Sequence, residues 1–205
     1  MMKIKNIIFD LGGVLIDWNP DYVFLKEFEG NNEQLQEFYN KICTFEWNEN
    51  QDAGYPLKNA TEERVKLFPE YENLIRMYYG RWEEMLGGAI VDSVSILKKI
   101  VDNPRYRVIA LTNWSAETFP IALKRFDFLH WFEGIVVSGT EKTRKPFRKI
   151  YNITLTRYNL KASNSLFIDD NSRNISAAKK IGIQTIKFNN PSQLENELKL
   201  KGVNL

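Results

Sequence analysis

The chain contains few of the residues on which several common chemistries depend. Among its 205 residues there is one cysteine, Cys43, and one histidine, His130. A single cysteine cannot form an internal disulfide bond, which favours a reducing compartment such as the cytoplasm. A single histidine excludes zinc sites built from several histidines and disfavours a serine–histidine–aspartate triad. Any catalysis is therefore expected to depend mainly on carboxylates, lysines and hydroxyl groups.

An excess of charge of one sign and a long apolar run are also missing. The 28 lysines and arginines nearly balance the 26 acidic residues, giving a net charge of +2, so the basic footprint of a nucleic-acid binder is absent. No apolar stretch approaches the roughly 20 residues that span a bilayer, and Asp10 interrupts the first apolar run. We therefore expect a cytoplasmic protein that binds neither nucleic acid nor membrane. The sequence leaves its oligomeric state open.

Short apolar runs alternate with helical patterns in residues 1–17 and 89–205. The runs cover residues 4–9, 107–111, 135–137, 166–168 and 183–188. They are continuous and rich in Val, Ile and Phe, which is typical of parallel strands buried on both faces. Helical patterns lie near 91–102, 116–126, 146–158, 172–181 and 191–200. This alternation predicts an α/β fold of three layers, a Rossmann-like core with a parallel sheet.

Residues 18–88 have a different pattern, in which apolar residues recur at helical spacing and no strand is predicted. Turn-like residues bound the segment, with Asn19 and Pro20 at one end and Gly87 and Gly88 at the other. We therefore expect a small all-helical unit inserted after the first strand. Its aromatic residues are interpreted mainly as core, with a minority facing a crevice; they are Trp18, Phe45, Trp47, Tyr78, Tyr79 and Trp82.

Polar segments follow four of the five predicted strands, at the sheet edge where open α/β folds bind ligands. They are Asp10 to Gly13 after the first strand, Thr112 and Asn113 after the second, residues 142–146 after the third, and Asp169 and Asp170 after the fourth. Because parallel strands place their carboxyl ends together, we expect these segments to converge on one crevice.

The residue types in these segments suit phosphoryl transfer. Asp10, Asp169 and Asp170 would repel one another in one crevice unless a cation lay between them. Mg²⁺ prefers hard oxygen ligands and usually takes one or two protein carboxylates together with phosphate and water. Lys145 would supply a second positive charge, and the hydroxyl and amide after the second strand offer neutral donors. An aspartate beside a metal ion and a lysine is a known nucleophile for phosphoryl transfer.

This ordered set of motifs resembles that of the haloacid dehalogenase-like (HAD) hydrolase superfamily, and the helical insert lies where that superfamily carries its C1-type cap. The resemblance implies a core strand order of 5-4-1-2-3 and a cap hinged near residues 17–20 and 86–90. It also implies roles for individual residues. Asp10 would be the nucleophile and a Mg²⁺ ligand with the Gly12 carbonyl, Asp169 and Asp170, while Thr112, Asn113 and Lys145 would bind or neutralise the phosphoryl group.

One position departs from the family pattern. Phosphatases of this superfamily usually carry a second aspartate two residues after the nucleophile, which acts as general acid and base. Here that position is Gly12, and general acid catalysis is worth roughly 10²–10⁴ in rate. We therefore expect a reduced rate and a preference for good leaving groups, unless a cap residue or a water replaces the acid. Asp17, at the predicted hinge, is one candidate surrogate.

The stretch around Asp10 and Gly12 is similar to sugar-phosphate phosphatases of the alpha-glucose-1-phosphate phosphatase type, which also lack the usual acid. The resemblance implies a Mg²⁺-dependent hydrolase of a small phosphorylated metabolite. Two alternatives stay open: an L-2-haloacid dehalogenase-type hydrolase, and a non-catalytic homologue that binds a phosphorylated ligand or a partner. In the basic loop, Lys142 and Arg144 are interpreted as solvated, and Pro146 is expected in the first turn of the next helix, where it would fix Lys145.

Overall fold

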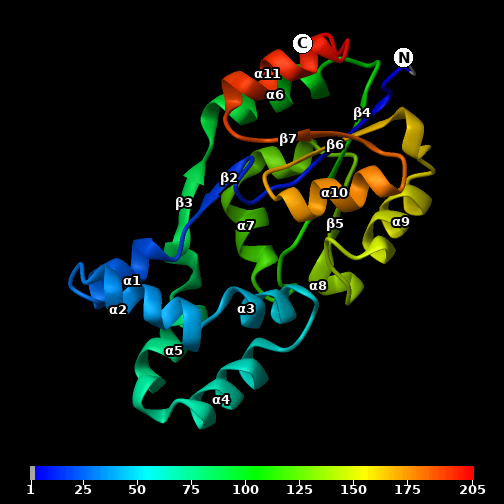
Figure 1. The fold of residues 1–205 in the computed structure, drawn as a ribbon. Helices are drawn as coiled ribbons and strands as arrows, with labels where there is room; N and C mark the ends of the chain where they lie inside the picture. The colour runs from blue at the N-terminus through cyan, green and yellow to red at the C-terminus, as the bar shows by residue number, and fades with distance from the viewer. Residues whose placement is uncertain (1–2) are drawn as a thin grey trace.

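A five-stranded parallel sheet forms the centre of the molecule, which a computed structural model describes for residues 3–205 (Figure 1). Its strands are β1 (Asn6–Phe9), β4 (Arg107–Thr112), β5 (Gly134–Val137), β6 (Ser165–Asp169) and β7 (Gln184–Lys187). The order across the sheet is β5-β4-β1-β6-β7, and every neighbouring pair is parallel. The first strand therefore lies at the centre of the sheet, between β4 and β6.

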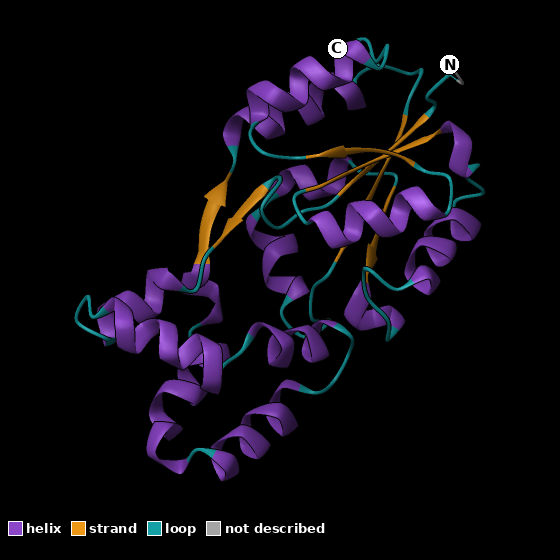
Figure 2. Cartoon of the chain, in the orientation of Figure 1, coloured by secondary structure: helices purple, strands orange, loops and turns teal. Residues whose placement is uncertain are grey.

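Helices cover both faces of the sheet because successive residues of each strand point to opposite sides. On β1, Ile7 and Phe9 enter one apolar core, whereas Ile8 enters a second core on the other face. The first core is closed by α6 (Val91–Val101), α7 (Phe119–Arg125) and α11 (Pro191–Leu200), and the second by α9 (Arg148–Arg157) and α10 (Ser172–Lys180). The result is the predicted three-layer α/β architecture (Figure 2).

The order of the strands needs one correction in its numbering. The expected order of 5-4-1-2-3 counts five strands, whereas residues 3–205 form seven, so the same arrangement of the five sheet strands reads β7-β6-β1-β4-β5. The two additional strands, β2 (Ile16–Trp18) and β3 (Leu86–Ala89), pair with each other in antiparallel fashion outside the main sheet. They are too short, and β3 too rich in glycine, to carry a strand pattern.

The polypeptide between β2 and β3 is helical and extends away from the sheet (Figures 1 and 2). We call residues 19–85 the helical unit. Its α-helices are α1 (Asp21–Glu27), α2 (Asn32–Glu37), α3 (Phe45–Asp52), α4 (Leu57–Leu67) and α5 (Glu72–Gly80), and a π-helical turn covers Phe38–Ile42. Buried aromatic contacts hold these helices together, including Phe24 against Phe38 and Trp47 against Tyr78.

The α-helices of residues 3–205 are short. The longest, α4 and α6, have 11 residues each, about half of what a membrane-spanning helix requires. None of them is long and apolar enough to cross a bilayer.

The helical unit contacts the main sheet's loops through α3. The carbonyl of Asp52, the last residue of α3, accepts a hydrogen bond from the hydroxyl of Ser138, which begins the short helix α8 (Ser138–Glu141) directly after β5. Close approach of the two backbones depends on glycine. A Cβ at Gly54 would lie 2.6 Å from the carbonyl oxygen of Gly139. This contact places the end of α3 over the carboxyl ends of the strands.

Candidate active site

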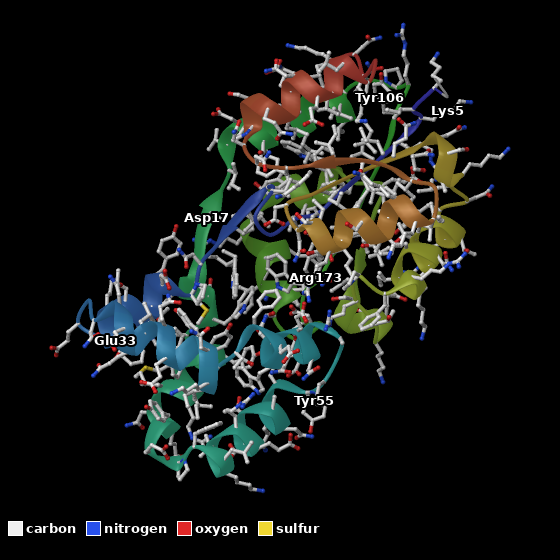
Figure 3. The ribbon with its side chains drawn as sticks, in the orientation of Figure 1. Lys5, Asp17, Glu33, Tyr55, Tyr106 and Arg173 are labelled. Atoms are coloured by element: carbon white, nitrogen blue, oxygen red, sulfur yellow. The ribbon has the colours of Figure 1, made fainter. Side chains whose placement is uncertain are left out.

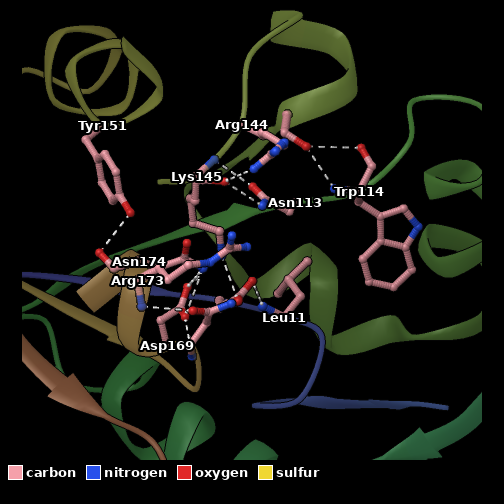
Figure 4. A network of polar contacts seen from close by, with 12 residues as sticks. Leu11, Asn113, Trp114, Arg144, Lys145, Tyr151, Asp169, Arg173 and Asn174 are labelled. Atoms are coloured by element: carbon pink, nitrogen blue, oxygen red, sulfur yellow. Dashed lines mark hydrogen bonds and ion pairs between the residues drawn. The ribbon is translucent and has the colours of Figure 1, made fainter. Parts of the chain in front are cut away.

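Lys145 joins two aspartates from neighbouring strands. Its Nζ lies 2.7 Å from Oδ2 of Asp10, which follows β1, and 2.8 Å from Oδ2 of Asp169, which ends β6. The lysine is fully buried, and Asp10 is only 7% exposed. The segments after the first, third and fourth sheet strands thus meet at one point, and Figure 4 shows Lys145 reaching Asp169 there. A buried ammonium between two carboxylates is the central feature of the site.

Asp169 is held on both of its oxygens. The backbone N–H of Asn171 donates to Oδ1 at 2.7 Å, and the side-chain amide of Asn174 donates to both oxygens at 3.1 and 3.0 Å. Asn174 lies on α10, and its main-chain carbonyl accepts a hydrogen bond from the hydroxyl of Tyr151 on α9 (Figure 4). With Lys145 in addition, Asp169 has few free lone pairs, so it is fixed as a partner for the lysine.

Asn113 fixes the main chain of Lys145. The Oδ1 atom of Asn113 accepts from the Lys145 N–H at 2.8 Å, and its Nδ2 donates to the Lys145 carbonyl at 3.0 Å. Both ends of the amide are thereby used within the protein. The expectation that Pro146 lies in the first turn of the next helix is wrong, because α9 begins at Arg148. The position of the lysine depends on Asn113 instead.

The charges around Lys145 shift the pKa values of the groups in contact. Burial raises the pKa of Asp10 well above its usual range; Lys145 opposes this, while Asp169 and Asp170 add to it. Burial alone would lower the pKa of Lys145, but the carboxylates of Asp10 and Asp169 outweigh it and raise the value. The lysine is therefore protonated at neutral pH, and the three carboxylates are only partly neutralised by one ammonium.

The same carboxylates form a cluster that suits a divalent cation. One oxygen each from Asp10, Asp169 and Asp170 lie within 4.8 Å of one another. Asp170 is exposed, and Asp170, Asp10 and Gly12 all line one cavity. Glycine at position 13 allows the carboxylate of Asp170 to lie close to the main chain, since a Cβ at this positive-φ position would lie 2.7 Å from Asp170 Oδ2. Oxygen ligands with open positions beside them fit Mg²⁺.

Thr112 is the last residue of β4 and directly precedes Asn113. Its side chain is 1% exposed, and its hydroxyl has no hydrogen-bond partner within residues 3–205. A buried hydroxyl without a partner costs free energy, which makes this group a candidate to bind a substrate oxygen. This is the role that the resemblance implies for Thr112.

A cavity of about 270 Å³ opens between the sheet and the helical unit. Aromatic side chains from both parts form much of its wall. Four of the six aromatic residues interpreted mainly as core line this cavity, namely Trp18, Phe45, Tyr79 and Trp82, and Trp114 joins them from the segment after β4. Helical spacing identified the buried side of these helices but could not show that part of that side faces a crevice.

The expectation that Arg144 is solvated is wrong. Its guanidinium lies 2.6 Å from Glu49 of α3, and its side chain is only 13% exposed. Glu49 is 4% exposed and also pairs with Arg173 of α10. Glu49 therefore joins the helical unit to two separate elements of the α/β core. Lys142, in contrast, is exposed as predicted.

Asp17 lies on β2 in the antiparallel pair of β2 and β3, away from the end of α10 that carries Arg173 (Figure 3). Its carboxylate accepts a hydrogen bond from the hydroxyl of Tyr22, and it does not contribute to the wall of the cavity described above. Asp17 is therefore poorly placed to act as a surrogate acid. Glu49, Asp52 and Asn174 were not predicted as site residues, because α3 and α10 carry many polar residues and periodicity does not distinguish those that face the sheet edge.

The parallel α/β sheet carries the carboxylate–lysine cluster at its carboxyl edge, where open α/β folds bind their ligands. The family model described as haloacid dehalogenase-like hydrolase matches residues 7–188. The chain belongs to the haloacid dehalogenase-like hydrolase family, and it is a hydrolase.

Similar proteins extend over most of the chain. It is 23% identical over 188 residues to the phosphorylated carbohydrates phosphatase of Thermotoga maritima, covering 89% of this chain and 84% of the relative. A HAD family enzyme of Bacteroides thetaiotaomicron, solved with magnesium and inorganic phosphate, has a TM-score of 0.69 and 21% identity, covering 91% and 95% of the two chains. The L-2-haloacid dehalogenase of Xanthobacter autotrophicus has a TM-score of 0.64 and 14% identity, covering 98% and 85%. Both structures share the fold.

Proposed function

We propose that the chain is a magnesium-dependent phosphatase that hydrolyses a small phosphorylated metabolite through an aspartyl-phosphate on Asp10. The observation that carries this proposal is the position of Lys145 Nζ, in contact with both Asp10 and Asp169. A carboxylate nucleophile beside a fixed ammonium suits attack on phosphorus, where negative charge must be offset. Membership in the family and the similarity to a named phosphatase support the same chemistry.

Asp10, Lys145, Thr112 and Asn113 have separate roles in this reaction. Asp10 attacks phosphorus, so that a bond from its Oδ to phosphorus forms while the bond to the leaving oxygen breaks. Lys145 offsets charge on the transferred group, and the hydroxyl of Thr112 donates to a phosphoryl oxygen. Asn113 acts indirectly, because both ends of its amide hold the main chain of Lys145. Water then attacks the phosphorus of the aspartyl-phosphate, which releases inorganic phosphate and restores Asp10.

Mg²⁺ would be held by Asp10, Asp170 and the Gly12 carbonyl, which line the cavity, with Asp169 beside them. When bound, it would supply positive charge that orients the phosphoryl group and lowers the repulsion among the carboxylates. Asp169 is the least free of these ligands, since Asn171, Asn174 and Lys145 occupy its oxygens. We propose that Asp169 contributes mainly by fixing the lysine.

A sugar phosphate is the substrate class that the cavity favours. Its wall combines aromatic rings with amide groups and carboxylates, and such surfaces suit the apolar faces and hydroxyl groups of a carbohydrate. The indole N–H groups of Trp18 and Trp114 are buried and have no partner among residues 3–205, so two donors are available there. The named relative acts on phosphorylated carbohydrates.

We propose further that residues 18–88 form a cap of the C1 type on a core made of residues 1–17 and 89–205. The paired strands β2 and β3 form the two chain connections between these parts. Cavity walls come from both, since Phe45 and Tyr79 lie on the helical unit, and Asn113 and Asp170 lie on the core. Closure of such a cap would exclude water from the reaction, as lids commonly do.

The two alternatives have less support. An L-2-haloacid dehalogenase needs no metal ion, whereas three carboxylates converge here on one point; the likeness to the dehalogenase structure, at 14% identity, concerns the fold. A non-catalytic binder would have no use for a carboxylate nucleophile in contact with a buried lysine.

A hydrolysis assay with p-nitrophenyl phosphate and a panel of sugar phosphates, with and without Mg²⁺, tests this function. We expect hydrolysis that requires the metal and is lost in Asp10→Asn. Asp92→Asn is the matched control, because Asp92 is an exposed aspartate on α6. Activity that survives either removal of the metal or the Asp10 substitution contradicts the mechanism. Chloride release from 2-chloropropionate would establish the dehalogenase alternative.

A further inference from the structure

The place of the usual general acid is open in this chain. Gly12 lines the cavity beside Asp10, and a Cβ built at Gly12 would have no atom within 4 Å. A side chain at this position would thus fit, yet none is present. Hydrolysis of an ester with a poor leaving group needs a proton for the departing oxygen, so another group must supply it.

Asp52 of the helical unit lines the same cavity. It is the last residue of α3 on the helical unit, and it lines the cavity together with Asp10 and Gly12. Its main chain is anchored to the core, because its carbonyl accepts a hydrogen bond from the hydroxyl of Ser138. The nucleophile thus comes from the α/β core and this carboxyl group from the helical unit, and both line one cavity.

The side chain of Asp52 is oriented by its own helix. The amide of Asn48 donates to Asp52 Oδ2 at 3.3 Å, and the hydroxyl of Tyr79 on α5 donates to the Oδ1 of Asn48 at 3.0 Å. Asn48 and Tyr79 both line the cavity as well. A chain of hydrogen bonds from α5 through α3 thus sets where the carboxyl group of Asp52 points.

The surroundings of Asp52 keep its carboxyl group protonated in a large fraction of the molecules near neutral pH. Burial raises the pKa of Asp52 to about 7, and the charge of Glu49 acts in the same direction. Arg144, Lys145 and a hydrogen bond from the backbone of Ser115 oppose the increase without cancelling it. A carboxylic acid that holds its proton up to the working pH is suited to general acid catalysis.

We propose that Asp52 donates the proton to the leaving oxygen, in place of the side chain that is missing at Gly12. This inference rests on the proposed phosphatase function. As the bond from phosphorus to the leaving oxygen breaks, the O–H bond of the Asp52 carboxyl breaks and the proton passes to that oxygen. In the second step the Asp52 carboxylate takes a proton from the water that attacks the aspartyl-phosphate, which restores the acid.

Other acidic groups near the cavity are less suitable. Glu49 also lines it, but its carboxylate is paired with Arg144 and Arg173. Asp17 accepts a hydrogen bond from Tyr22 and is not part of the cavity wall. Asp52 alone among these three combines a place in the wall with a raised pKa and no ion-pair partner within 4.0 Å among residues 3–205.

The substitution Asp52→Asn tests the proposal with two substrates of different leaving group. Hydrolysis of β-glycerol phosphate, whose alkoxide needs a proton, should fall about 100-fold or more, in keeping with the usual effect of a general acid. Hydrolysis of p-nitrophenyl phosphate, whose phenolate leaves unaided, should change by less than about fivefold, which also shows that the variant is folded. An unchanged ratio of the two rates overturns the proposal.

Two further variants make the test specific. Glu46→Gln removes an exposed carboxylate from the same helix and should leave the ratio of the two rates unchanged. Adding Gly12→Asp to Asp52→Asn should restore hydrolysis of the alkyl phosphate at least tenfold, because the open space at Gly12 accepts the missing acid; no restoration contradicts a proton-donor role. Failure of the phosphatase function itself looks different, since the wild-type protein would then show no Asp10-dependent hydrolysis of either substrate.

Discussion

Asn113 holds the main chain of Lys145 by both ends of its side-chain amide, at 2.8 Å to the N–H and 3.0 Å to the carbonyl. Asn113, which follows β4, and Lys145, which follows β5, are therefore held in a fixed relative position. This pairing explains how a lysine on a loop can present its ammonium to two carboxylates at fixed distances.

Asn113→Ala should weaken both stability and catalysis. Loss of the two hydrogen bonds leaves the buried N–H of Lys145 without a partner and its carbonyl with Arg144 as its remaining donor, and an unpaired buried N–H costs about 1–3 kcal/mol. Urea unfolding measures the change in free energy, and kcat should fall because the ammonium of Lys145 is less well placed. Asn152→Ala, at an exposed position of α9, is the control. An Asn113→Ala protein with the stability and kcat of the wild type would show that the pairing has no mechanical role.

Lys145→Met should be more destabilising. The substitution leaves Asp10 and Asp169 buried without their cation, and removal of one partner from a buried ion pair costs about 3–5 kcal/mol. The raised pKa of Lys145 means that its stabilising effect is complete below the usual lysine pKa and disappears only as the pH rises through the raised value. Urea unfolding at pH 7 therefore detects the whole difference, and equal stabilities would contradict the ion-pair account.

Glu49→Gln should loosen the contact between the helical unit and the core. Glu49 bridges Arg144 and Arg173 from its place on α3, and the substitution removes the charge that both guanidinium groups share. We expect an increase in KM and faster proteolysis within residues 19–85. Glu46→Gln on the exposed side of α3 should change neither quantity. If Glu49→Gln is as resistant to protease as the wild type, the bridge does not hold the helical unit against the core.

The pKa of Asp52 predicts a pH dependence of stability that is independent of any activity. Burial raises this pKa from 3.8 to about 7, so the folded protein binds the proton more tightly than the unfolded chain does. Stability should therefore fall as the pH rises from about 4 to about 7 and then level off. Asp52→Asn removes this contribution, so its melting temperature relative to the wild type should rise between pH 5 and pH 8. A constant difference would show that the carboxyl group is not buried as described.

Much of the fold follows from patterns in the sequence, because four of the five sheet strands contain a continuous run of three or four apolar residues and polar residues follow these runs. The edge strand β7 has a mixed pattern instead. The approximate positions of five core helices were also predictable, for example near 91–102 for α6 and near 191–200 for α11. The pairing of β2 with β3 was not predicted. These strands have only three and four residues, and β3 contains Gly87 and Gly88, so neither carries a strand pattern. Tertiary pairing decides their conformation.

The site was predictable where the fold dictates convergence and not where it depends on the helical unit. Asp10, Lys145 and Asp169 follow or end strands of one sheet, so topology brings them together. Glu49 and Asp52 lie on α3, whose direction relative to the core depends on the contact of Gly54 with Gly139. Local sequence does not encode such a contact, which is why Arg144 was misread as solvated and Asp52 was not selected.

The central claim is that Asp10 carries the phosphoryl group during turnover. Acid quenching of the enzyme during hydrolysis of p-nitrophenyl phosphate in Mg²⁺, followed by peptide mass spectrometry, tests it most directly. We predict a phosphorylated peptide whose modification maps to Asp10, and its loss in Asp10→Asn. Turnover without a phosphorylated intermediate, or with the phosphoryl group on another residue, would contradict the account.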